Sequence, residues 1–162
     1  MLLSSAPAWL ATYQHHELLL GRGLALLGIW AVLNLLVSGY QLPRTDVREW
    51  PHHFHLMNAG WACVNAILAA VGILRTHPGL PPAGFTASDA LAGQQLTGYI
   101  FLVNAVLDVG YVLLGRWLWR RSQAPAARRP ERLYGFGRSI VLQGSFLLAF
   151  DAAMYLVLRL AS

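Results

Sequence analysis

The sequence predicts an all-α integral membrane protein, a single domain (residues 1–162) built as a bundle of four transmembrane helices. Hydrophobic residues make up 56% of the chain and charged residues 12%, a balance far from that of a soluble globular protein. Four apolar stretches reach the length of about 20 residues that a helix needs to cross a bilayer. The chain has one cysteine, Cys63, so an intrachain disulfide and a Cys-x-x-Cys metal site are both excluded.

The four spans follow one another with residues between them that are typical of helix ends. We expect the spans at residues 18–40, 52–74, 95–117 and 135–160. Pro51 stands just before the second span, in the first turn of a helix, where proline is best tolerated. Thr86 and Asp89 have the spacing of a capping box, which predicts that the third helix begins before it enters lipid.

The arginines predict the orientation in the membrane. The chain contains no lysine, and its arginines gather at the ends of the apolar stretches. The link between the third and fourth spans holds five of them against one acid, Glu131: they are Arg120, Arg121, Arg128, Arg129 and Arg132. Short cytoplasmic loops collect positive charge, so we expect this link inside and both termini on the outer side. The membrane we expect is the bacterial cytoplasmic (inner) membrane.

This orientation explains the net charge of +5 without nucleic acid as a partner. Four aromatic residues are then candidate anchors at the inner interface: Trp50, Trp117, Trp119 and Tyr134. The basic link has two interpretations. It sets the topology alone, or it also holds anionic lipid headgroups through Arg120, Arg121, Arg128 and Arg129.

Polar residues inside the spans recur at steps of three and four, which places them on one face of each helix. We expect these faces to turn toward other helices, because an amide or a charge exposed to lipid is costly. The residues that we predict to bind a solute, an ion or a proton are Asn34, His55, Asn58, Asn65, Asn104, Asp108, Tyr111 and Asp151. For the asparagines in the spans, interhelical hydrogen bonds that only hold the bundle together are the alternative.

Asp108 and Asp151 are the strongest candidates for function. An acid near the middle of a span must find a cation or take up a proton, and no basic residue lies at their depth in the sequence. We therefore expect at least one of them to be protonated at rest or to bind a cation. Hydrogen bonding to Tyr111, Tyr155 or an asparagine is the structural alternative.

The histidines at the start of the second span suggest a metal site. His52 and His55 share a helix face, and Asp46 and Glu49 precede them, a set of ligands that suits zinc or another divalent metal. Haem is a further alternative, but its second axial histidine would come from another subunit or from a strained His52. Hydrogen bonding to headgroups or loop carbonyls is the simplest explanation for these histidines.

The sequence therefore favours a membrane protein that binds or passes a small solute, an ion or a proton. No nucleophile stands at a recognised spacing from a histidine and no glycine-rich phosphate loop occurs, which favours a protein that is not an enzyme. The alternatives are an accessory subunit of a larger membrane complex and a metal or haem redox protein. If the protein is a transporter, we expect a homo-oligomer, since four spans rarely enclose a complete path.

Overall fold

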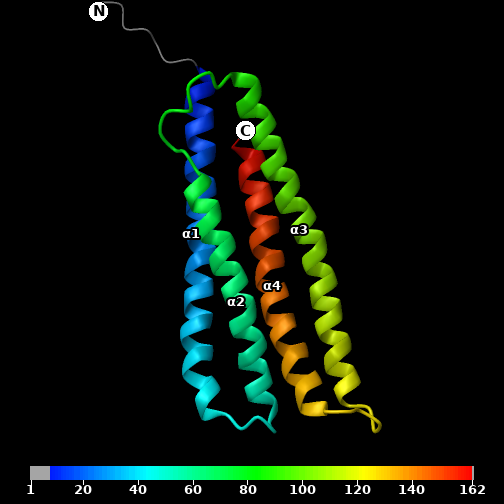
Figure 1. The fold of residues 1–162 in the computed structure, drawn as a ribbon. Coiled ribbons are helices and arrows are strands. Elements are labelled where there is room, and N and C mark those ends of the chain that lie inside the picture. Colours follow the sequence, from blue (N-terminus) through cyan, green and yellow to red (C-terminus); the bar gives the residue numbers. More distant parts are fainter. Residues whose placement is uncertain (1–7, 162) are drawn as a thin grey trace, which may run out of the picture.

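The computed structural model describes residues 8–161, and within them the chain forms four long α-helices in one bundle (Figure 1). They are α1 (Ala8–Gln41), α2 (Trp50–Arg75), α3 (Ala87–Ser122) and α4 (Pro130–Leu160), with a short 3-10 turn, η1 (Leu42–Arg44), after α1. Consecutive helices run in opposite directions, so α1 begins and α4 ends at the same end of the bundle. All four are long and apolar enough to cross a membrane. The predicted all-α four-helix membrane fold is confirmed.

The helices extend beyond the expected spans, chiefly at the end that carries the termini. The helix α1 has 34 residues and α3 has 36, and a helix of that length rises about 50 Å, whereas the hydrocarbon core is about 30 Å thick. A helix can continue into water because its backbone hydrogen bonds are internal. The predicted capping box is present: Thr86 Oγ1 accepts from the Asp89 N–H, and the Asp89 carboxylate accepts from the Thr86 N–H.

The helix α4 is the central element, and it packs against each of the other three helices. Glycines bring its backbone close to its neighbours. A Cβ atom at Gly137 would lie 2.7 Å from the carbonyl oxygen of Gly115 in α3, and one at Gly115 would lie 2.8 Å from the carbonyl oxygen of Gly137. On another side of α4, Gly135 approaches the backbone of α2 at Trp50. These contacts require glycine, because a side chain would hold the helices apart.

Aromatic rings close the end of the bundle that carries the basic link. The guanidinium of Arg138 in α4 lies 5.0 Å from the ring centre of Trp50, 5.7 Å from that of Tyr134 and 5.9 Å from that of Trp119. Three of the four aromatic residues expected as interface anchors therefore surround one arginine. Because the rings come from α2, α3 and α4, the cluster ties these helices together at this end.

The helices α2 and α3 do not pack against each other. No Cα atom of α2 comes within 8 Å of a Cα atom of α3, although both helices approach α4 that closely. Packed helices normally lie 8–10 Å apart, axis to axis. The space between α2 and α3 is lined by the exposed side chains of Val64, Leu68 and Leu107, so the bundle opens there, and α4 packs against both helices behind the opening.

Candidate ligand-binding site

Two groups of buried polar side chains occupy the middle of the bundle. The first, which we call the amide network, joins α1, α2 and α4 and consists of Trp30, Asn34, Ser38, Asn58, Asn65 and Gln143. The second, which we call the acidic pair, consists of Asp108 in α3 and Asp151 in α4. They differ in how completely their polar atoms are satisfied.

Gln143 is the hub of the amide network, and its side chain is fully buried, with an exposed fraction of 0%. Its amide nitrogen donates to Asn34 Oδ1 at 3.2 Å and to Asn58 Oδ1 at 2.5 Å. Its amide oxygen accepts from Trp30 Nε1 at 3.0 Å and from Asn65 Nδ2 at 3.4 Å. Both donor hydrogens and both acceptor lone pairs of this side chain are thus used.

The asparagines of the network also satisfy one another. Asn58 Nδ2 donates to Asn34 Oδ1 at 2.7 Å and to Ser38 Oγ at 3.0 Å, and Asn34 Nδ2 donates to the backbone carbonyl of Trp30 at 2.8 Å. The Trp30 ring stacks on Phe146 with 4.0 Å between the ring centres. No fully buried polar atom of the network lacks a hydrogen-bond partner, so the network holds helices together well and leaves little for a ligand to bind.

Gln143 was absent from the residues predicted from sequence. In the fourth span Gly137, Gly144 and Asp151 recur at steps of seven residues, and Gln143 lies one residue off that pattern. A signal was available, since Gln143 precedes Asp151 by eight residues, or about two helical turns, which places both on one side of α4.

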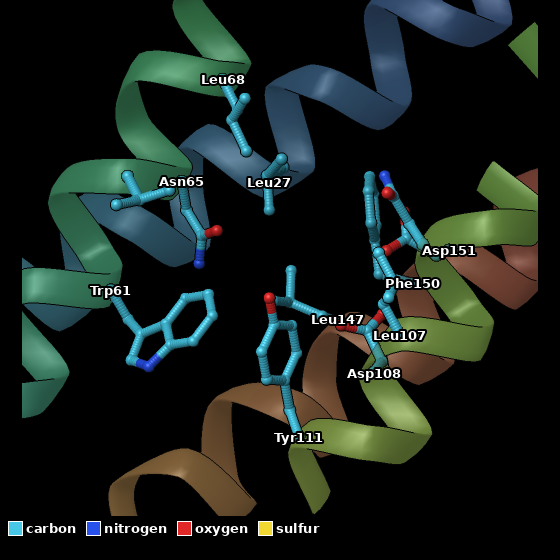
Figure 2. A pocket seen from close by; sticks show the side chains of 12 residues that line it. Leu27, Trp61, Asn65, Leu68, Leu107, Asp108, Tyr111, Leu147, Phe150 and Asp151 are labelled. Carbon is cyan, nitrogen blue, oxygen red and sulfur yellow. The ribbon is translucent and has the colours of Figure 1, made fainter. Parts of the chain in front are cut away.

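The acidic pair lies at the bottom of a pocket of about 200 Å³ between α2, α3 and α4, with one residue from α1. Figure 2 shows the side chains of the four helices pointing toward a common empty centre. The lining residues are Leu27, Trp61, Val64, Asn65, Leu68, Asn104, Leu107, Asp108, Tyr111, Leu147, Phe150 and Asp151. Five of the eight residues predicted as a site line this one pocket: Asn65, Asn104, Asp108, Tyr111 and Asp151.

The two carboxyl groups are buried, with exposed fractions of 3% for Asp108 and 6% for Asp151. They lie within side-chain hydrogen-bonding range of each other. Among residues 8–161, neither forms an ion pair with a basic side chain, and Asp108 Oδ2 has no hydrogen-bond partner. Two carboxyl groups so close together in an apolar environment cannot both stay charged without a cation or a shared proton.

Aromatic rings bound the pocket toward the end that carries the basic link. Trp61 of α2 and Tyr111 of α3 meet edge to face with 5.0 Å between the ring centres, across the gap between their helices. The Tyr111 hydroxyl points into the pocket in Figure 2. Asn65 joins the two polar groups, because it lines the pocket and also donates to Gln143.

The other three predicted residues lie outside the pocket. Asn34 and Asn58 belong to the amide network, and His55 continues it toward the start of α2, where its Nδ1 lies 3.5 Å from Ser38 Oγ. From His55 the hydrogen bonds lead through Ser38 and Asn58 to Gln143, whereas the acidic pair lies beyond that residue.

The histidines expected to bind metal have separate partners. His52 Nδ1 lies 3.3 Å from Thr45 Oγ1, and His55 faces Ser38. In the part of the chain that the structure describes, no three His, Cys, Asp or Glu side chains come together as a possible metal site. Asp46 and Glu49 therefore do not complete a shell around these rings. A site made from His52 and His55 alone, or haem on His55, stays a prediction.

Comparison with known proteins gives one match. Residues 26–152 match the model of DUF6992, which is described as a family of unknown function. The match covers most of the four spans and both groups of buried polar residues. Neither a curated protein nor a solved structure matches the chain.

Proposed function

Since the chain belongs to the family DUF6992, whose function is unknown, we propose from the site alone that this membrane protein binds a small cation at its acidic pair. A proton shared by the two carboxyl groups takes the place of the cation when the site is empty. One observation carries the proposal: two buried carboxyl groups line a pocket and have no basic partner among the described residues.

The chemistry of the pocket supports a cation over a neutral solute. A neutral solute would gain from the amides of Asn65 and Asn104, but it would leave the carboxyl groups without a counter charge. A cation compensates that charge, and its attraction to the carboxylates is stronger here than in water because the surroundings are apolar. The rings of Trp61, Tyr111 and Phe150 line the same pocket, and aromatic faces also attract cations.

The experiment is infrared titration of the protein in lipid nanodiscs. A protonated carboxyl group has a carbonyl stretching band that a carboxylate lacks. We expect this band in the cation-free protein, its loss when methylammonium is added, and its absence from the Asp108→Asn/Asp151→Asn double variant. A titration that shows the same spectra for the parent protein and the double variant would contradict the proposal.

Passage of the cation across the membrane is the further step of this proposal, and it requires a homo-oligomer. Toward the basic link the fully hydrogen-bonded Gln143 lies beyond the pocket, and in the other direction lies an apolar cluster formed by residues such as Phe101, Phe150 and Met154. Within residues 8–161, one copy of the bundle thus offers no polar path along its axis. Uptake of methylammonium into proteoliposomes, with the oligomeric state measured in the same lipid, tests this step.

The orientation and the lipid partner are also proposals. We place the link between α3 and α4 in the cytoplasm of a bacterial cell, with both termini outside. Its arginines support anionic lipid as a partner: Arg120 lines one hollow of about 320 Å³ with Arg116 and Trp119, and Arg121 and Arg128 line another of about 390 Å³. The fourth arginine of the predicted set, Arg129, immediately precedes α4. Retention of cardiolipin or phosphatidylglycerol by the purified protein, lost on Arg120→Gln/Arg121→Gln, tests this assignment.

The second candidate function is that of an accessory subunit in a membrane complex. The opening between α2 and α3 supports it, because a helix of a partner protein would fit against that side and a basic side chain would neutralise the acidic pair. Native mass spectrometry of the protein extracted in mild detergent distinguishes the two. A second protein at fixed stoichiometry favours the subunit, and the chain alone or with copies of itself favours the cation site.

A further inference from the structure

We propose that the cation is an amphiphilic amine, a molecule with one ammonium group and an apolar body, and that it enters the pocket sideways from the lipid between α2 and α3. This inference rests on the proposed function, since it names the class of ligand for the acidic pair.

The position of the opening excludes an approach along the bundle axis. The pocket lies between helices whose Cα atoms stay more than 8 Å apart, and its residues on α3, from Asn104 to Tyr111, lie at the middle of the third span. The Trp61–Tyr111 ring pair blocks it on the side of the basic link. At this depth the medium outside the opening is hydrocarbon, so a ligand that enters here must dissolve in the membrane.

The lining of the pocket changes from apolar at the mouth to acidic at the bottom. Three aliphatic side chains at the mouth are exposed, with fractions of 48% for Val64, 56% for Leu68 and 53% for Leu107. The carboxyl groups at the bottom are almost completely buried. An ammonium group fits the bottom, and an alkyl or aromatic body fits the mouth and the lipid beyond it.

One atom at the bottom lacks a partner. Asp108 Oδ2 is buried and accepts no hydrogen bond from any described residue, although its neighbours in the pocket include two amides and a tyrosine. A buried acceptor without a donor is costly, and an ammonium group carries up to three N–H donors. Its docking would satisfy this atom and reach the carboxyl group of Asp151.

The size and donor set of the pocket also favour an organic cation over a metal ion. A cavity of about 150 Å³ holds a benzene ring, so a pocket of about 200 Å³ has room for the polar end of a small amine. Calcium prefers six to eight oxygen ligands, and magnesium retains several waters. An ion that keeps its waters would have to pass the aliphatic mouth.

The test compares octylamine, methylammonium and octanol by calorimetric titration of the full chain in zwitterionic nanodiscs, with empty nanodiscs as the blank. Octylamine carries both the charge and the apolar body, methylammonium carries the charge, and octanol carries the body. We expect one saturable octylamine site per chain, at least about tenfold tighter than methylammonium, because each pair of methylene groups withdrawn from water contributes about that factor. We expect no such site for octanol.

Two variants locate the site. Asp108→Asn should weaken octylamine binding about tenfold or more, since it removes the charge that receives the ammonium group. Leu107→Trp should fill the mouth and weaken octylamine binding, while methylammonium still binds. Val106→Trp is the matched control: Val106 is exposed on the same helix and does not line the pocket, so its substitution should leave both affinities unchanged.

The outcomes separate the two proposals. Methylammonium binding as tight as octylamine binding, both lost in Asp108→Asn, would overturn the amphiphilic ligand and leave the cation site in place. Octylamine binding that Asp108→Asn does not weaken would show partition at another surface and overturn the inference. If neither amine binds in a way that depends on Asp108, the proposed function fails as well.

Discussion

The amide network and the acidic pair lie in the same bundle and are almost equally buried, and Asn65 of the network lines the pocket of the acidic pair, yet the two groups differ in how many of their polar atoms have hydrogen-bond partners. Every polar atom of Gln143 has a hydrogen-bond partner, whereas Asp108 retains a buried oxygen without one. The network is enclosed by three helices, and the acidic pair faces a pocket that opens between two. Polar residues in a membrane protein thus fall into two kinds: those whose hydrogen bonds hold the helices together, and those with unpaired polar atoms that a ligand can bind.

The close contact of α3 with α4 supports the acidic pair, and breaking it should have the largest effect. Gly137→Ala places a methyl group 2.7 Å from the Gly115 carbonyl oxygen and 2.8 Å from the Trp119 nitrogen, both backbone atoms. We expect the free energy of unfolding in bicelles to fall by about 3 kcal/mol, because backbone cannot rotate away as a side chain does. Cation affinity should fall too, since α3 carries Asp108 away from Asp151.

Gly110→Ala is the matched control for that change. It lies on the same helix as Gly115, and a methyl group there would have no atom within 4 Å. We expect its free energy of unfolding to stay unchanged or to rise by up to about 1 kcal/mol, as the helix propensities of alanine and glycine dictate. Equal losses in the two variants would show that the close contact contributes nothing specific.

Gln143→Leu tests whether the amide network acts on stability alone. Leucine has a side chain of similar volume, but the variant loses four hydrogen bonds, each worth roughly 0.6 kcal/mol in a membrane protein. We therefore expect the free energy of unfolding to fall by about 2 kcal/mol. Octylamine affinity should stay within about twofold of the parent value, since the side chain does not line the pocket. Gln95→Leu, at an exposed glutamine of α3, should leave both quantities unchanged.

Asp108→Asn should weaken amine binding without lowering stability, the opposite of what we expect for Gln143→Leu. We expect the free energy of unfolding of the ligand-free protein to stay at or above the parent value, because the change removes a buried group that can be charged. Amine affinity should fall about tenfold, which is about 1.4 kcal/mol. A variant with a lower free energy of unfolding and unchanged amine affinity would show that Asp108, like the amide network, acts on stability and not on binding.

Trp30→Phe should have the smallest effect, and it separates the contribution of the Trp30–Gln143 hydrogen bond from that of the ring stack. It removes the donor to Gln143 Oε1 at 3.0 Å and retains an aromatic ring to stack on Phe146. We expect a loss of about 0.6 kcal/mol in the free energy of unfolding, the average for one such bond in lipid. A loss above the one found for Gln143→Leu would mean that the ring stack, not the hydrogen bonds, holds α1 against α4.

Helical spacing predicted much of the candidate site. The repeat of three and four residues placed Asn104, Asp108 and Tyr111 on one face of α3, and these residues line one pocket. The same repeat grouped Asn34 and Asn58 with them as binding residues, although the structure places both in the amide network. Spacing identifies the face of a helix, but the partner opposite that face belongs to another helix, whose rotation the spacing does not contain.

The sequence by itself determined the four helices, their antiparallel order and the capping box at Thr86, because each depends on local hydrophobicity, length or hydrogen bonding. It also identified Asp108 and Asp151, since an acid near the middle of a span is costly and its depth can be read from the sequence. Only the tertiary structure decided that Gln143 completes the amide network and that α2 and α3 stand apart. Both depend on how closely α4 approaches its neighbours, which backbone contacts at glycines such as Gly115 and Gly137 allow.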